Sequence, residues 1–319
     1  MKTLSLSALL LCVMCVLVMM NLSFGAVSLT FNDLLSGFQP TSEFYFTIHE
    51  YRLPRTLLAM LVGGMMALSG TLVQGVIRNP LASPDVLGVS HGAGLAAVLL
   101  MTLYPDVSVY WLPWTALCGG LLAALVLWLL CGSHSSAIKL AITGIALATL
   151  YGSLVDFLML TRPLEINNAL LWLTGSLWGR GWDQVTMILP WLILVPVAFW
   201  LAKRINLVQL GDDVATSLGV SIPVTRLAVL AIAVGMTAAC VSICGPIGFL
   251  GLVAPHLARR LVGGRHQILL PCAILVGMTL LLLADLVART IDPPIELPAG
   301  IMTAILGAPY FLWLLFRTK

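Results

Sequence analysis

The sequence predicts an all-α polytopic membrane protein. Of its 319 residues, 60% are hydrophobic and 9% are charged, and the mean hydropathy is +1.04. A soluble domain carries about 25% charged residues and cannot bury this much apolar surface. The apolar residues form runs of about 20, the length of helix that crosses a hydrocarbon core of about 30 Å. Because these runs are continuous and lack the alternation of a membrane β-barrel, helices are expected.

About ten such runs are expected to span the membrane, within a single transmembrane domain over residues 1–319. The run at the N-terminus follows Lys2 and exceeds the apolar core of a signal peptide, so we interpret it as a retained first span. The eighth run is short and rich in glycine and proline. The predicted spans are 4–24, 54–76, 86–103, 111–131, 139–161, 185–203, 224–243, 246–262, 267–289 and 299–316.

The distribution of basic residues predicts the orientation. An even number of spans places both termini on one side of the membrane. If that side is the inner one, 11 of the 16 Lys and Arg residues fall in inner segments and 5 in outer segments. Because cytoplasmic loops carry an excess of basic residues, both termini are predicted to be cytoplasmic. The net charge of +3 is scattered over short loops and gives no indication of nucleic-acid binding.

The most distinctive polar segment is LVQLGDDVATSLGVS, residues 207–221, which is too short to span and falls on the predicted inner side. Spacings of three and four place its apolar residues on one helical face. Asp212 or Asp213 can cap the start of this helix, and Gly219 suits its end. We expect a soluble partner to bind here. The apolar residues of the face are Leu207, Leu210, Val214 and Leu218.

No catalytic motif is found along the chain. The sequence contains no G-x-x-x-x-G-K-[ST] phosphate loop, no H-E-x-x-H and no G-x-S-x-G, so neither ATP binding by the usual route nor a hydrolase site is expected. Cys12 and Cys15 form a CxxC pair in the first apolar run. Without further ligands, we interpret them as small buried hydrophobic residues and expect no metal site.

Three ionisable residues in the predicted spans support an alternative function. Asp156 and Asp285 are acidic residues within spans, which are functional candidates by default, although a hydrated position near the membrane surface also explains them. His256 is a candidate proton carrier or ligand, or else a histidine that is hydrogen-bonded to backbone carbonyls. Together the three residues define the alternative of a proton-coupled secondary transporter.

Arg52 and Arg55, in the RLPR sequence, lie on the predicted outer side, against the general charge bias. Arginine pairs with carboxylates through two parallel hydrogen bonds, so these residues suit docking of an acidic external protein. Snorkelling of their side chains to the membrane surface is the alternative.

Six motifs, taken in order, resemble the permease subunits of type II ABC importers, the family that takes up ferric siderophores, haem and vitamin B12. The resemblance covers nearly the whole chain after the first span. Within the family, the sequence is most similar to permeases of ferric citrate importers. The motifs are RLPR, Gln74 followed by RNPLASP, WLTGSL at 172–177, LGDDVATSLGV, GPIGFLGLVAPH and ELPAGIMTAILGAP.

This resemblance implies a type II ABC importer permease fold with ten helices in a bacterial inner membrane. It also implies a second permease subunit, a paralogue rather than an identical copy, together with two cytoplasmic ATPases and a periplasmic binding protein. The chain itself would bind no cofactor and hydrolyse no ATP, which the ATPases would use. The substrate would be an iron(III) chelate, iron(III) citrate first, carried by alternating access.

The family pattern also assigns roles to individual residues. For Arg289 the spacing is looser than for Arg52 and Arg55, so docking and snorkelling both stay open. Contacts with the ATPase are implied for Leu210, Gly211, Asp212, Ala215, Leu218 and Gly219. Docking of the binding protein is implied for Arg52, Arg55 and Arg289, and the translocation path or its gate for Gly144, Thr174, Gly175 and Ser176.

Overall fold

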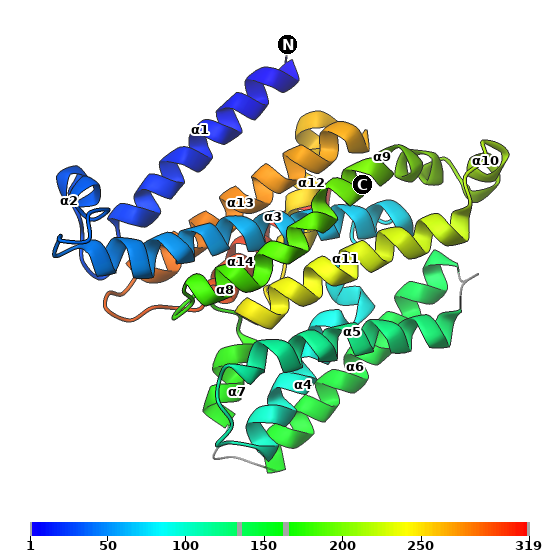
Figure 1. Ribbon diagram of the computed structural model, residues 1–319. Coiled ribbons are helices and arrows are strands. Elements are labelled where there is room, and N and C mark those ends of the chain that lie inside the picture. The colour runs from blue at the N-terminus through cyan, green and yellow to red at the C-terminus, as the bar shows by residue number, and fades with distance from the viewer. Residues whose placement is uncertain (1, 133–135, 162–165, 318–319) are drawn as a thin grey trace.

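The protein is described by a computed structural model over residues 2–132, 136–161 and 166–317 (Figure 1). These residues form helices joined by short connections, with a single isolated β-bridge between Asp292 and Ile295. The α-helices are α1 (Lys2–Ser23), α2 (Phe31–Ser36), α3 (Leu53–Ile77), α4 (Val89–Leu103), α5 (Trp111–Cys131), α6 (Ala137–Thr161), α7 (Ile166–Leu173), α8 (Trp182–Ile188), α9 (Leu194–Gln209), α10 (Asp212–Ser217), α11 (Ile222–Cys244), α12 (Leu250–Val262), α13 (His266–Thr290) and α14 (Ala299–Arg317). A π-helix η1 (Phe46–Arg52) and 3-10 helices η2 (Pro84–Leu87) and η3 (Leu189–Ile193) complete the described elements.

The expectation of an all-α membrane protein is confirmed. Within the described residues, seven helical segments are long and apolar enough to cross a membrane, and α4 and α14 contain shorter apolar helices. Each of the ten predicted spans coincides with a helix or with consecutive helices. The eighth is the 13-residue helix α12. The sixth is longer than expected, because α8, η3 and α9 continue from Trp182 to Gln209.

Helix α3 is the centre of the fold. It packs against α13, α11, α12 and α9, and most of its length is buried. Small residues allow this packing. A Cβ atom on Gly63 would lie 2.5 Å from the carbonyl oxygen of Gly277 on α13, and one on Gly70 would overlap the carbonyl group of Gly251 on α12. Glycine at these crossings lets the helix backbones approach closely.

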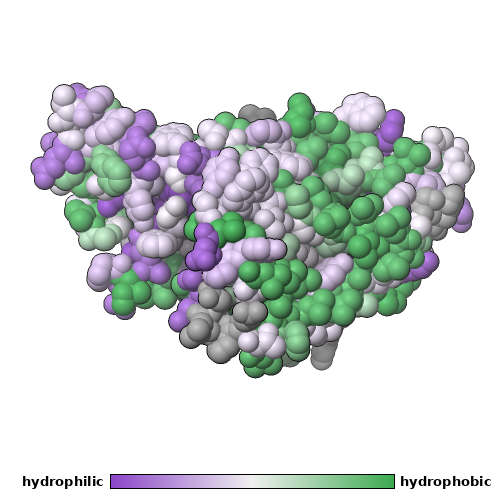
Figure 2. All heavy atoms as spheres, turned by 60° about the horizontal axis from the view of Figure 1, so that its bottom comes forward, coloured by the Kyte–Doolittle hydropathy of each residue, from purple (hydrophilic) through white to green (hydrophobic). Residues whose placement is uncertain are grey.

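A second group of helices, α4, α5, α6 and α7, lies beside this centre (Figure 1). Helix α4 packs along α5 and also contacts α6, and α11 connects the two groups because it contacts both α3 and α5. Much of the surface is apolar, and Figure 2 shows hydrophobic residues over a broad part of one face. This distribution is the one expected of helices that face lipid.

The N-terminal region differs from the sequence expectation in two respects. The segment between the first two predicted spans contains α2 and η1, and the second span begins earlier than predicted, because η1 and α3 together extend over Phe46–Ile77. Thr30 and Asp33 form a capping box that starts α2, and Ile48 of η1 is fully buried. Cys12 and Cys15 are exposed rather than buried. Helix α1 packs chiefly against α13, which leaves its other side on the molecular surface.

The ends of the helices define two ends of the molecule. The N-terminus, the C-terminus and α10 lie toward one end, and α2 and the connection from α13 to α14 lie toward the other (Figure 1). We call these the α10 end and the α2 end. The arrangement agrees with an even number of spans.

Candidate functional site

The segment 207–221 forms a projecting turn of helix at the α10 end. Helix α9 ends at Gln209, and α10 begins after Gly211, whose φ of +118° lies in a region that L side chains rarely adopt. Gly219, with φ of +82°, follows the end of α10, as expected from the sequence. The sequence predicted that Leu207 shares one helical face with the other apolar residues of this segment, and that prediction is wrong. The helix breaks at Gly211, so Leu207 belongs to α9 and packs against buried residues instead.

Three apolar side chains of this segment are nevertheless exposed. Leu210, Val214 and Leu218 are 62%, 45% and 57% exposed. Ala215 is fully buried, and it packs with Val208, Val220 and Ile222 to hold α10 against the ends of α9 and α11. A firmly anchored element that exposes three apolar side chains has the properties of a binding surface.

Asp212 connects this element to two long helices. The expected capping role is wrong, because Gly211 occupies the N-cap and both Asp212 and Asp213 lie in the first turn. Asp212 accepts hydrogen bonds from Arg78, which directly follows α3, and from Arg226 in α11, the latter at 3.2 and 3.3 Å. One carboxylate therefore connects α10 to the end of α3 and to α11.

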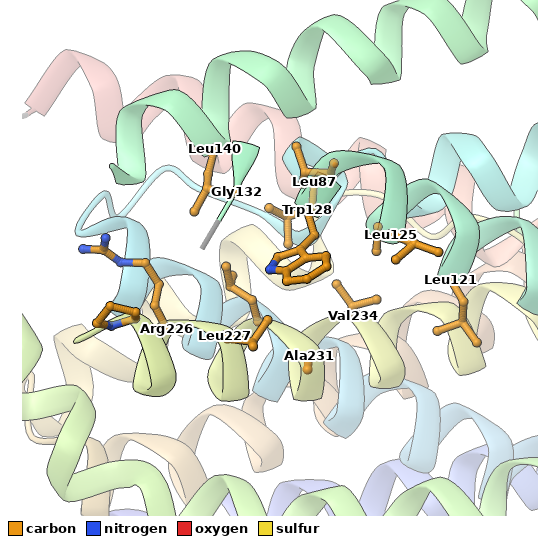
Figure 3. Close-up of a pocket in the computed structure, with 14 residues that line it drawn as sticks. Leu87, Leu121, Leu125, Trp128, Gly132, Leu140, Arg226, Leu227, Ala231 and Val234 are labelled. Atoms are coloured by element: carbon orange, nitrogen blue, oxygen red, sulfur yellow. The ribbon is translucent and has the colours of Figure 1, made fainter. Parts of the chain in front are cut away.

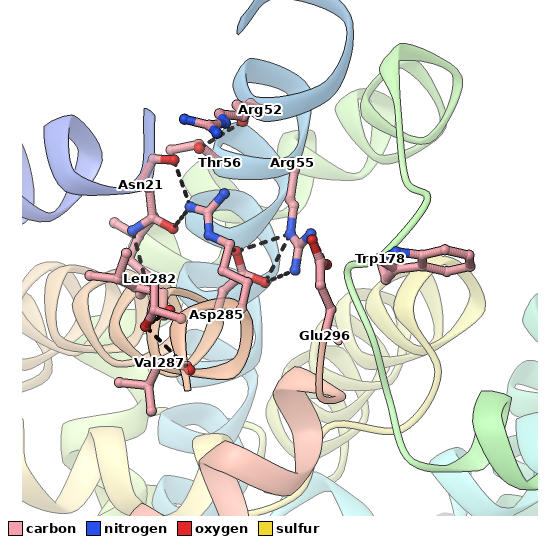
Figure 4. Close-up of polar contacts among 12 residues, drawn as sticks. Asn21, Arg52, Arg55, Thr56, Trp178, Leu282, Asp285, Val287 and Glu296 are labelled. Atoms are coloured by element: carbon pink, nitrogen blue, oxygen red, sulfur yellow. Dashed lines mark hydrogen bonds and ion pairs between the residues drawn. The ribbon is translucent and has the colours of Figure 1, made fainter. Parts of the chain in front are cut away.

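A buried cluster of charged residues lies at the α2 end (Figure 4). Arg55 of α3 donates to both carboxylate oxygens of Asp285 on α13, at 2.9 to 3.1 Å, and to Glu296 at 2.5 Å. The hydroxyl group of Tyr51 donates to Glu296 at 3.3 Å. The Nε of Arg289 is 3.8 Å from Asp285. This cluster joins α3, α13 and the segment before α14.

The three arginines with an implied docking role are all buried within the chain. Arg52, Arg55 and Arg289 are 3%, 1% and 2% exposed. Arg52 donates to the carbonyl oxygens of Leu22 and Ser23 at 2.8 Å, and Arg289 donates to the side chain and carbonyl group of Asn21. Snorkelling is therefore wrong for Arg52 and Arg55. Docking stays a prediction.

The predicted Thr174–Ser176 segment crosses two other motifs. The backbone N–H of Ser176 donates to the carbonyl group of Cys244 at 2.7 Å, and that of Gly300 donates to Gly175 at 2.9 Å. A Cβ atom on Gly300 would overlap the carbonyl oxygen of Thr174. The backbones of the WLTGSL, GPIGF and ELPAG motifs are thus in direct contact with one another. In the sequence, only the glycines of these motifs indicate that their backbones can approach so closely.

A cavity of about 970 Å³ opens beside this crossing, with walls from α4, α6 and α14. Thr174 lines it, whereas Gly175 and Ser176 lie behind it in the crossing and Gly144 packs against the carbonyl group of Val86. Asp85, Ser90 and His91 of this wall were not predicted from the sequence, although they are polar residues within or beside an apolar run. The polar side chains of the wall are Asp85, Ser90, His91, Asp156 and Thr174.

The structure does not bring the three proposed relay residues together. Asp156 lines the cavity, Asp285 is fully buried in the charged cluster, and His256 lies beside Tyr310, with ring centroids 6.1 Å apart. A hydrated position for Asp285 is therefore wrong. The expected hydrogen bonds from His256 to backbone carbonyls are also wrong, because neither ring nitrogen has a partner among the described residues. The imidazole instead packs against an aromatic ring.

Comparison with known proteins identifies the family. Over 302 residues the chain is 49% identical to the Fe(3+) dicitrate transport system permease protein FecD of Escherichia coli (strain K12), with 94% of this chain and 95% of that protein covered. It is 46% identical to the Fe(3+)-citrate import system permease protein YfmE of Bacillus subtilis (strain 168), with 86% and 83% covered.

A solved structure and a family model agree with these relatives. The chain superposes with a TM-score of 0.87 on an inward-facing conformation of a metal-chelate type ABC transporter, at 33% identity and with 97% of both chains covered. Residues 11–317 match the FecCD transport family. The resemblance inferred from the ordered motifs is confirmed, and the chain is a member of the FecCD transport family.

Proposed function

We propose that this chain is the permease subunit of an ABC importer that carries an iron(III) chelate, iron(III) citrate first, from the periplasm to the cytoplasm. The segment around α10 carries the proposal, because it projects from the molecule, exposes the apolar side chains of Leu210, Val214 and Leu218, and is connected through Asp212 to α11 and the end of α3. The named substrates of the two relatives support the choice of chelate.

The chain would work with separate partners in a bacterial inner membrane. One of two cytoplasmic ATPases would bind the α10 segment through Leu210, Gly211, Asp212, Leu218 and Gly219, and the ATPases alone would use ATP. Ala215 would support this contact from behind, because it is buried against α9 and α11. This chain would be non-catalytic and bind no cofactor, metal or nucleic acid. A paralogous permease would complete the path, and both termini would be cytoplasmic, on the same side as α10.

Transport would proceed by alternating access. Closure of the ATPases would displace α10, and the Arg78–Asp212–Arg226 ion pairs would pass the displacement to α3 and α11. The cavity beside Thr174 would form part of the path. The Thr174–Ser176 crossing would act as the gate, with Gly144 supporting the wall from behind.

A periplasmic binding protein would dock at the α2 end through Arg52, Arg55 and Arg289. Their guanidinium groups are buried in this structure, so docking would require carboxylates of the partner to replace contacts now made by Glu296, Asp285 or Asn21. Arg55 is the strongest candidate for such an exchange, because its ion-pair partner Glu296 is more exposed than Asp285.

The α10 proposal is tested in proteoliposomes that contain the complete complex. Leu210→Glu with Leu218→Glu should abolish iron(III) citrate uptake and release the ATPase during purification, because two charges replace the exposed apolar contact. Gln209→Glu is the matched control, since it adds a carboxylate to an exposed polar position next to Leu210. Normal uptake by the double variant would contradict the proposal.

The proton-coupled alternative makes the opposite prediction. It requires uptake by this chain alone in ATP-free vesicles, with loss of uptake when the proton gradient is dissipated. The comparisons do not favour it, and Asp285, one of its three residues, is paired with Arg55.

A further inference from the structure

An apolar groove of about 310 Å³ runs between α5 and α11 (Figure 3). Arg226 stands at one end, Trp128 and Val234 lie nearer the middle, and Leu121 lies at the other end. The lining is almost entirely hydrocarbon. Its principal side chains are Leu121, Leu125 and Trp128 from α5 and Leu227, Leu230 and Val234 from α11.

Positive charge gathers at one end of this groove. Arg226 lines it, and Arg78 shares the carboxylate of Asp212 with Arg226. Lys139 of α6 donates to the carbonyl oxygen of Cys131 at 3.1 Å, next to the groove residue Gly132. Two carboxylates oppose these three cations, those of Asp212 and of its neighbour Asp213 on α10. Among the residues that the structure describes here, positive charge is therefore in excess at the α10 end of the groove.

The dimensions of the groove match one leaflet of a bilayer. Arg226 and Val234 are eight residues apart on α11, which corresponds to about 12 Å along the helix axis. One leaflet of a hydrocarbon core of about 30 Å is about 15 Å thick. The groove thus begins at the level of the cationic residues and ends near the middle of the membrane. An amphiphile with an anionic headgroup and an acyl chain matches this groove, because its charge would lie at the cationic end and its chain would extend along the apolar lining.

We propose that this groove binds an anionic phospholipid, with one acyl chain along Trp128 and the phosphate group near Arg226 and Lys139. Basic pockets between membrane helices are known to bind anionic headgroups in this way. A membrane-spanning helix of a partner needs about 20 residues and would cross both leaflets. The groove covers only one, which favours a lipid as the occupant.

The position of the headgroup gives the site a consequence for α10. A phosphate near Arg226 would share this arginine with Asp212, the residue that connects α10 to α3 and α11. The bound lipid would therefore contact the same ion pairs that hold α10. The lipid site does not depend on the proposed transport function, because it rests on the groove and its charges alone.

Fluorescence quenching tests the site. The purified protein is placed in phosphatidylcholine nanodiscs that contain increasing amounts of dibrominated phosphatidylglycerol or dibrominated phosphatidylcholine. The difference between wild type and Trp128→Phe isolates the quenching of Trp128 from that of the other tryptophans. We expect the phosphatidylglycerol to quench Trp128 at a lower mole fraction than the phosphatidylcholine. Because one Lys or Arg near an anionic surface contributes about fivefold to affinity, Arg226→Gln should shift the midpoint by about fivefold.

Two further variants keep the test decisive. Lys139→Gln leaves the Asp212 ion pairs intact and should produce a similar shift even if Arg226→Gln disturbs the fold. Lys203→Gln removes an exposed charge from α9, away from the groove lining, and should leave the midpoint unchanged. Equal quenching by the two lipids, or an equal shift in Lys203→Gln, would overturn the proposal. Absence of quenching at Trp128 by either lipid would also overturn it and would indicate that protein covers the groove.

Discussion

At the scale of single residues, the charged cluster at the α2 end shows how a buried arginine is tolerated. Arg55 is 1% exposed, yet its guanidinium group donates to Asp285, to Glu296 and to the hydroxyl group of Tyr51. Removing charges from water is costly, and the cost is offset only when the geometry is good and the hydrogen bonds are complete. The cluster therefore stabilises the fold only as long as it stays whole.

Loss of one partner in this cluster should destabilise the protein. Asp285→Asn leaves Arg55 and Arg289 without their shared carboxylate, and breaking a buried pair costs about 3–5 kcal/mol. We expect a clearly lower Tm for the purified protein in detergent. Asp156→Asn removes the same charge from the exposed wall of the cavity and should change the Tm little. Equal Tm values for the two variants would show that the cluster does not stabilise the fold.

Asp85 provides a pH-dependent prediction. Burial raises the pKa of its carboxyl group above 3.8, although the hydrogen bond from Ser90 opposes the shift. The folded protein then holds this proton more tightly than the unfolded chain, so the contribution of Asp85 to stability is lost as pH rises through the raised pKa. Asp85→Asn should therefore raise the Tm at neutral pH and flatten the dependence of Tm on pH above 4. An unchanged pH profile would contradict this prediction.

At the scale of elements, glycines decide which helices and segments can meet. Gly63 on α3 faces Gly277 on α13, and Gly70 faces Gly251 on α12. The sequence alone does not show which helix each of these glycines meets. The boundaries of the long helices were predictable because hydrophobicity and length define a membrane span. The break at Gly211 was not, because a helical spacing of apolar residues continues across it.

The Thr174–Ser176 crossing gives a prediction at this scale. In Gly300→Ala the new methyl group would overlap the carbonyl oxygen of Thr174, and overpacking of this kind costs about 1–3 kcal/mol. We expect reduced iron(III) citrate uptake by the reconstituted complex, together with a lower Tm. Gly264→Ala is the control, because a Cβ atom there meets nothing within 4 Å. Full uptake by Gly300→Ala would show that the crossing is not tightly constrained.

At the scale of the whole molecule, segments far apart in the sequence come together at both ends. The α10 end combines α10 with Arg78 from the end of α3 and Arg226 from α11. The α2 end combines α3, α13 and the segment before α14 around Arg55. The cavity beside Thr174 lies next to the crossing of three motifs. The proposed importer needs all three regions, one for each partner and one for the chelate.

The sequence by itself determined the fold class, the approximate spans, the family and the polar segment that becomes α10. These features follow from hydrophobicity, helix length and ordered local motifs, which are properties of neighbouring residues. Only the tertiary structure decided that Asp212 pairs with Arg78 and Arg226, that Arg55 is buried with Asp285, and that His91 joins Thr174 on one cavity wall. Such contacts depend on how helices cross in space, and the side chains that meet there are separated by many residues along the chain.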